Sequence, residues 1–161
     1  MTADETGQFD VWVDVVRTTW FRAVWAGDSQ HVAAVGVPQL VEARLVLTGG
    51  LKRAYAHDGK WHLYHVGKRV MLIVSLFPAK SDDRVCFPFE RWTGSRWASM
   101  SSPCFRTMDY KGESVAGIGW TGLPKGFKGR ITASWDPKAQ KPDDTSNLGD
   151  TLNWQYFRVT R

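Results

Sequence analysis

The chain has no long apolar run: no apolar stretch reaches the roughly 18 residues that a membrane-spanning helix needs. The opening residues, MTADETGQFD, are polar and acidic, so they lack the basic and apolar regions of a secretory signal peptide. We therefore expect no membrane span. The protein is either cytosolic or secreted after removal of a signal peptide that is not part of this sequence.

Residues suited to catalysis or metal binding are scarce. The chain has 2 cysteines and 4 histidines, and no serine-hydrolase, zinc-protease, phosphate-loop or dinucleotide motif occurs in it. His57 and Asp58 adjoin, but neighbours on a strand point to opposite faces and cannot easily orient one another. Asp143, Asp144 and Asp150 share one segment without the ligand spacing of an EF-hand. The sequence therefore predicts a protein that is not an enzyme and that uses no metal or cofactor.

Acidic residues are outnumbered by basic ones, 16 to 21, which gives a net charge of +5 and a pI near 9.4. Such a charge permits attraction to anionic polymers without identifying one. The densest basic stretch runs from Lys52 to Arg69, and apolar residues interrupt it throughout. We interpret it as the solvent face of two strands rather than a polyanion site. No nucleic-acid partner is expected.

Helical spacing is also scarce, whereas alternation of apolar and polar residues dominates the chain. At 161 residues the length suits one well-buried core, so residues 1–161 are interpreted as a single domain. An aromatic content of 13% and turn signals at close intervals favour many short strands. The pattern indicates an all-β sandwich or barrel.

The clearest alternation lies near the N-terminus. In the stretch from Phe9 to Trp20, the residues Phe9, Val11, Val13 and Val15 occupy every second position, which predicts a strand with one apolar face. It could be the first strand of the protein's own sheet, the preferred of two possibilities, or it could add to the sheet edge of another protein. In the second case the partner-binding residues are Phe9, Val11, Trp12, Val13 and Val15.

The two cysteines flank a stretch that reads as a hairpin, CFPFERWTGSRWASMSSPC. With Gly94 and Ser95 at the centre of the turn, Trp92 faces Trp97. The same register sets Cys86 opposite Pro103, so a one-residue bulge near Pro103 would bring Cys86 opposite Cys104. We predict a Cys86–Cys104 disulfide, with two free buried thiols in a cytosolic protein as the alternative. A bonded pair suits an oxidising compartment and favours secretion.

Trp92 and Trp97 have two interpretations. As a cross-strand pair they would stabilise the hairpin, which is the preferred interpretation. As an exposed coplanar pair they would form a stacking platform for a sugar ring. The other tryptophans are expected in the core or at its edge: Trp12, Trp20, Trp25, Trp61, Trp120, Trp135 and Trp154.

Two stretches carry loop signals. Residues 33–47 contain Pro38 among β-branched residues and are interpreted as a loop followed by a strand. Residues 136–150, DPKAQKPDDTSNLGD, combine prolines, polar residues and both charge signs. We expect one long exposed loop there, of a length that is often functional or mobile.

Several stretches between Leu45 and Arg161 resemble one family pattern. They are LVLTGGLKR, GKRVMLIV, FERWTGSRWASM, GFKGRITASW and NWQYFRVTR. Together they resemble the secreted immunoglobulin-like domains of high-GC Gram-positive bacteria. The resemblance implies an antiparallel immunoglobulin-like β-sandwich of about eight to ten strands, with a core over residues 40–161. Residues 1–25 would then be an N-terminal strand segment that can lie outside it.

Domains of this family serve as spacers, ligand-binding modules or subunits of extracellular assemblies. The size and layout are also similar to those of small adaptors in extracellular bacterial toxin particles, the umbrella toxins. The resemblance thus implies a secreted adaptor or accessory subunit. Its sandwich would pack on one protein subunit and its N-terminal strand would dock on another. The alternative is a carbohydrate-binding module that uses Trp92 and Trp97 on a cell-wall glycan.

Overall fold

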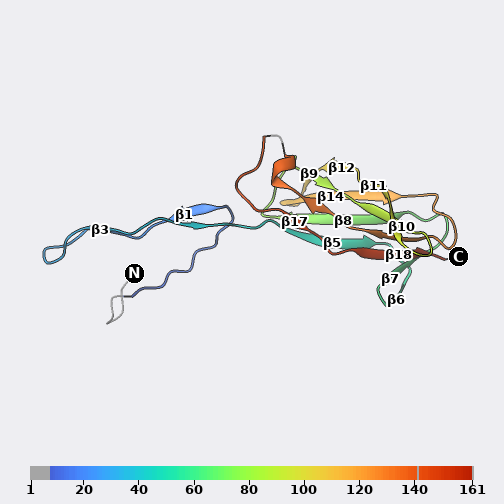
Figure 1. Ribbon diagram of the computed structural model, residues 1–161, viewed down its shortest axis with the longest axis horizontal. Coiled ribbons are helices and arrows are strands. Elements are labelled where there is room, and N and C mark those ends of the chain that lie inside the picture. Colours follow the sequence, from blue (N-terminus) through green and yellow to red (C-terminus); the bar gives the residue numbers. More distant parts are fainter. Residues whose placement is uncertain (1–7, 141, 161) are drawn as a thin grey trace.

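The computed structural model describes residues 8–140 and 142–160. An elongated body of stacked β-sheets contains most of the chain, and a narrow two-stranded arm projects from one end of it (Figure 1). Within the described residues the only helical element is the single-turn 3-10 helix η1, Pro137–Ala139. The predicted all-β class is confirmed.

One layer of the body is a four-stranded antiparallel sheet, ordered β13-β14-β8-β5. Strand β8 alternates buried and partly exposed residues along most of its length, because one face packs on the core and the other lies outside. The strands are β5 (Val46–Lys52), β8 (Val70–Phe77), β13 (Met108–Tyr110) and β14 (Glu113–Trp120).

The opposite layer consists of two sheets, and the chain passes directly from a strand of one to a strand of the other at several points. A six-stranded sheet is ordered β11-β10-β15-β18-β7-β6, and a four-stranded sheet is ordered β12-β9-β16-β17. Strands β18 and β7 pair in parallel, and the other pairs are antiparallel. The strands of the first sheet are β6 (Ala56–Asp58), β7 (Trp61–Tyr64), β10 (Phe89–Trp92), β11 (Trp97–Ser101), β15 (Lys128–Ile131) and β18 (Gln155–Val159). Those of the second are β9 (Arg84–Cys86), β12 (Cys104–Arg106), β16 (Ser134–Trp135) and β17 (Asp150–Thr151).

The core fills the space between the two layers. Phe157 lies at its centre, with ring centroids of Phe89 and Phe127 at 5.9 Å and that of Tyr64 at 6.2 Å. Trp135 of β16, which pairs with Asp150 of β17, is also buried in the core. The other core residues are the inward-facing side chains at every second position of the strands. This is the packing expected of two sheets stacked face to face. The body is therefore a β-sandwich with one continuous core.

The arm is a hairpin built from residues 19–41. Near the body β1 (Thr19–Phe21) pairs with β4 (Gln39–Val41), and towards the tip β2 (Val24–Trp25) pairs with β3 (Ala34–Val35). The tip turns at Gly27, whose φ of +84° is a conformation that favours glycine. The sequence-based interpretation of residues 33–47 as a loop and one strand is wrong in part, because β3 and β4 form the return half of this hairpin.

Candidate functional site

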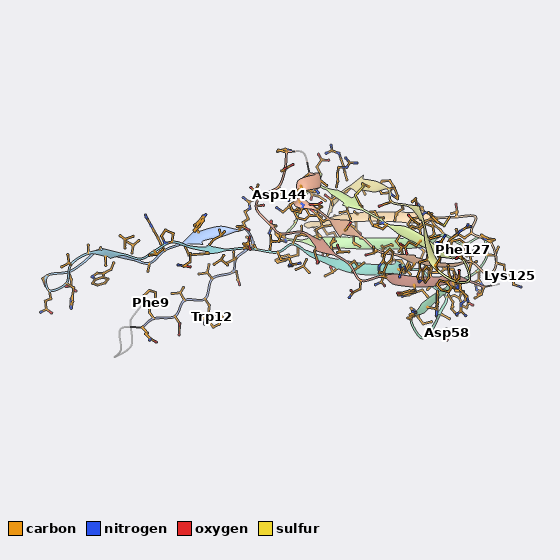
Figure 2. All side chains as sticks on the ribbon, viewed as in Figure 1. Phe9, Trp12, Asp58, Lys125, Phe127 and Asp144 are labelled. Atoms are coloured by element: carbon orange, nitrogen blue, oxygen red, sulfur yellow. A yellow bond between two sulfur atoms is a disulfide. The ribbon has the colours of Figure 1, made fainter. Side chains whose placement is uncertain are left out.

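The segment before the arm contributes no strand to the molecule. Residues 8–18 belong to no β-ladder, although the sequence predicted a strand from Phe9 to Trp20. Figure 2 shows Phe9 and Trp12 beside the arm and far from the sandwich. Trp12 is 97% exposed, and Phe9, Val11 and Val13 are each about half exposed. The preferred expectation, pairing within the protein's own sheet, is therefore wrong for residues 9–18, whereas Thr19 and Trp20 pair with β4.

The hairpin arm, like the segment beside it, carries exposed apolar side chains. Trp20, Val24, Trp25 and Val35 are more than half exposed, and Val32 at the tip is 90% exposed. The expectation that Trp12, Trp20 and Trp25 lie in or near the core is wrong. Large exposed apolar patches commonly mark sites of protein, membrane or ligand binding, so this surface is a candidate interaction site. A groove of about 620 Å³ runs between segment and arm and is lined by Phe9, Val11, Trp12, Val13, Val15, Phe21, Arg22, Ala23, Val24 and Val41.

The base of the arm is held by the loop that follows β16. The Thr18 amide donates to the Ser146 carbonyl at 2.7 Å, and Asn147 Nδ2 donates to the Val16 carbonyl at 3.1 Å. The Leu148 amide donates to the Ala43 carbonyl at 2.8 Å on the other side of the arm. Asn147 is buried, so the expectation of one fully exposed loop over residues 136–150 is wrong at this point. The loop fastens both ends of the arm to the body.

An ion pair between Lys80 and Asp144 holds the loop of residues 142–149 against the sandwich. Lys80 Nζ lies 2.5 Å from Asp144 Oδ2 and 2.8 Å from Ser146 Oγ, with both charged side chains largely buried. Burial alone would raise the pKa of Asp144, but hydrogen bonds from Lys80 and Ser146 outweigh it and lower that pKa. The ion pair therefore favours the ionised form of Asp144. Lys80 also contacts Ser146, whose carbonyl accepts the hydrogen bond from Thr18.

We predict that Asp144→Asn destabilises the protein at pH 7 and that this difference disappears in strong acid. A carboxyl group whose pKa is lowered by folding stabilises the folded state above its ordinary pKa of about 4. That stabilisation is lost as the pH falls through the lower pKa of the folded state. Thermal unfolding at pH 7, 4 and 2 measures the effect. Asp143→Asn is the matched control because Asp143 is exposed, and an equal effect of both changes would contradict the prediction.

The hairpin between the cysteines forms as predicted, with one difference. Trp92 pairs with Trp97 across the strands, and Cys86 pairs with Cys104, to which it is joined by a disulfide. The one-residue bulge lies at Met100, because Phe89 faces Ser101 while Glu90 faces Ser99. Its expected place near Pro103 is therefore wrong, although the pairing of the cysteines that it allows is confirmed.

The two hairpin tryptophans belong to a larger aromatic cluster on the outer face of the six-stranded sheet. The planes of Trp92 and Trp97 are inclined at 59°, with centroids 5.4 Å apart, so they are not the coplanar pair that a simple sugar platform needs. Arg130 lies over Trp97 at 4.7 Å and over Trp154 at 4.4 Å, while Glu90 binds Arg130 at 2.6 Å. Lys60 lies 4.0 Å from the ring centre of Tyr156. These cations cover ring faces that a sugar would otherwise contact.

Other candidate sites are not assembled by the fold. In the part of the chain that the structure describes, no group of three or more His, Cys, Asp or Glu residues could hold a metal ion. No helix there is long and apolar enough to cross a membrane. A scan against protein-family models and a search of curated proteins found nothing similar to this sequence. The class of the protein is thus defined by its architecture, an all-β sandwich that carries an apolar arm.

Proposed function

We propose that this protein is a secreted, non-enzymatic adaptor of an extracellular bacterial assembly, with an immunoglobulin-like body. In this proposal the N-terminal segment adds as a strand to the sheet of another subunit. The observation that carries the proposal is the state of residues 9–15, which belong to no β-ladder and whose apolar side chains are exposed or partly exposed. The disulfide supports an oxidising compartment.

Strand addition suits this segment for two physical reasons. Its main-chain N–H and C=O groups have no ladder of their own, so a partner's sheet edge can pair with them and supply affinity. Its side chains alternate, with Phe9, Val11, Val13 and Val15 on one face of an extended chain. That face can enter a partner's core and set the register.

The arm then serves as a spacer and second contact. It holds the segment well away from the sandwich (Figure 2), and its own exposed apolar side chains would be covered in the same complex. The sandwich remains available to a second subunit. On the similarity of size and layout, we propose an umbrella-type toxin particle as the assembly.

Proline substitutions give a direct test of strand addition. Proline has no N–H and cannot join a central ladder. Successive N–H groups of a strand point in opposite directions, so one of Trp12→Pro and Val13→Pro must remove a ladder bond if the segment pairs along one edge. We expect at least one of them to abolish partner binding. Val13→Thr, which keeps strand propensity and the N–H, should weaken binding much less.

The partner is first identified by a photocrosslinking residue at position 12, incubated with the extracellular fraction of the producing bacterium and analysed by mass spectrometry. A crosslinker at Phe77, exposed on the sandwich, is the control for non-specific capture. Binding of the purified partner is then measured by biolayer interferometry. The unfolding temperatures of the proline variants should match the parent, because residues 9–16 form no ladder. Undiminished binding by both proline variants would refute strand addition.

A further inference from the structure

Charge is unevenly distributed between the two ends of the sandwich. Four connections lie at the end away from the arm: residues 53–55, 65–69, 93–96 and 121–127. They contain no aspartate or glutamate, and they carry Arg53, Lys68, Arg69, Arg96 and Lys125. The long connections at the arm end, residues 78–83, 136–140 and 142–149, contain five acidic residues, Asp82, Asp83, Asp136, Asp143 and Asp144, and two lysines, Lys80 and Lys138. We call the first set of connections, with Arg91 and Lys128 beside them, the basic end.

The strand registers show that these connections share one end. Lys52 pairs with Met71 and Trp120 with Val70 in one layer, and Lys128 pairs with Arg158 in the other. The Tyr64 hydroxyl donates to the Lys52 carbonyl at 2.7 Å and so joins the layers there. Figure 2 shows Lys125 at the end opposite the arm. Residues that the sequence scatters from position 53 to position 128 therefore converge.

Hydrogen bonds hold these connections in place before any ligand binds. The Gly126 amide donates to the Val159 carbonyl at 2.9 Å, and the Lys68 amide donates to the His65 carbonyl at 3.1 Å. The Thr93 amide donates to the Arg96 carbonyl at 3.0 Å. A positive surface on fixed loops loses little conformational freedom when it binds.

Among residues 8–140 and 142–160, no ion pair joins a cation of the basic end to an acidic side chain. The ion pairs among the described residues join other groups: Asp28 with His31, Asp58 with Arg158, Asp82 with Arg106, Asp144 with Lys80, and Glu90 with Arg130. Because like charges repel one another, a surface that gathers them without neutralising them is suited to an anionic ligand.

A hollow at this end combines charge with an aromatic wall. Its volume is about 320 Å³, and it is lined by Arg91, Trp92, Thr93, Gly126, Phe127 and Lys128. Trp92 is 36% exposed, and in the described part of the chain no cation lies over its ring. The hollow thus offers a ring to stack on, a hydroxyl and two basic side chains.

We infer that the basic end binds an anionic glycan, with sugar carboxylates or phosphates on the cations and a sugar ring against Trp92. The disulfide favours an extracellular setting, where acidic polysaccharides are available and nucleic acids are not the expected ligand. This inference is independent of the proposed strand addition, because the basic end lies opposite the arm. It also changes the interpretation of the basic stretch at residues 52–69, whose charges join those of three other segments.

The test compares polymers that separate charge from sugar. Polygalacturonate supplies carboxylates on sugar rings, and poly(glycerol phosphate) supplies phosphates on a chain without rings. Dextran supplies neutral rings, and inorganic polyphosphate supplies charge alone. We expect polygalacturonate to bind most tightly in isothermal titration calorimetry at low salt, with affinity falling as salt is added, and dextran not to bind.

Two variants test which residues of the basic end bind the glycan. Lys125→Glu/Lys128→Glu should weaken binding of both charged classes by about tenfold or more, since each change reverses a cation. Trp92→Ala should weaken polygalacturonate by about tenfold, the loss of one stacked ring, and leave polyphosphate unchanged. Lys138→Glu, an exposed change at the arm end, should have little effect on either.

Two results would overturn the inference. One is the absence of polygalacturonate binding at low salt by a folded protein. The other is equal binding of polygalacturonate and polyphosphate that Trp92→Ala does not alter, which would show attraction to any polyanion. Matching unfolding temperatures of the parent and the variants exclude loss of fold as the cause of weaker binding.

Discussion

Replacing Phe157 by alanine is expected to destabilise the sandwich by about 3–5 kcal/mol, the usual cost of removing a buried phenyl ring. Phe157 is fully buried and contacts rings from β7 and β10 and from the connection before β15. Its side chain also lies where a Cβ on Gly129 would stand, at 2.4 Å. Because strand β15 has a glycine there, the ring reaches across the sheet and joins four segments.

The loss should appear as a lower midpoint in urea with an unchanged slope, because the surface exposed on unfolding is nearly the same. Phe77→Ala is the matched control, since it removes the same side chain from a position that is 66% exposed. Its expected effect is within about 0.5 kcal/mol. Comparable losses from both changes would show that Phe157 is not the centre of the core.

The sequence predicts the sandwich because its signals are local. Alternation along β8 and the turn at Gly94 each depend on neighbouring residues, and they place strands and hairpins correctly. The sequence does not locate the bulge at Met100, because one extra residue anywhere between the turn and Cys104 gives the same pairing of the cysteines. A register predicted from the two ends of a hairpin therefore does not locate the irregularity between them.

The arm was missed for a different reason. Its two halves, Trp20–Trp25 and Val32–Val37, are apolar on either side of a turn at Gly27, which is a hairpin signal. Apolar strands are ordinarily assigned to a core, so the sequence predicts a core position for Trp20 and Trp25 as well. Nothing local shows that a hairpin projects into solvent, because that depends on whether the body leaves space beside its strands.

The two ends of the molecule differ in the kind of partner each can accept. The arm end presents apolar side chains and unpaired main chain, which suit another protein. The opposite end presents cations and Trp92, which suit an anionic ligand. The sandwich lies between them, so both surfaces are accessible at once (Figure 2). The proposed adaptor function therefore requires no conformational change in the body.

Removing the disulfide is the second change for which we expect a large effect. Cys86→Ala/Cys104→Ala should cost about 3 kcal/mol, because the bond closes a loop with a sequence separation of 18 and restricts the unfolded chain. The variant should still fold. Its ladder is also held by the Phe87 amide, which donates to the Pro103 carbonyl at 2.9 Å, and by pairing of Cys86 with Ser134.

Urea unfolding of the double variant, compared with the parent in the presence and absence of reductant, measures this cost. Reduction of the parent should reproduce the effect of the substitution, and reductant should not change the variant. The Cys86–Cys104 pair joins β9 to β12 and lies farther from the turn than the Trp92–Trp97 pair. Partner binding at either end should therefore persist in the variant at temperatures where it remains folded. A cost below about 1 kcal/mol would mean that the ladder, and not the bond, restricts this hairpin.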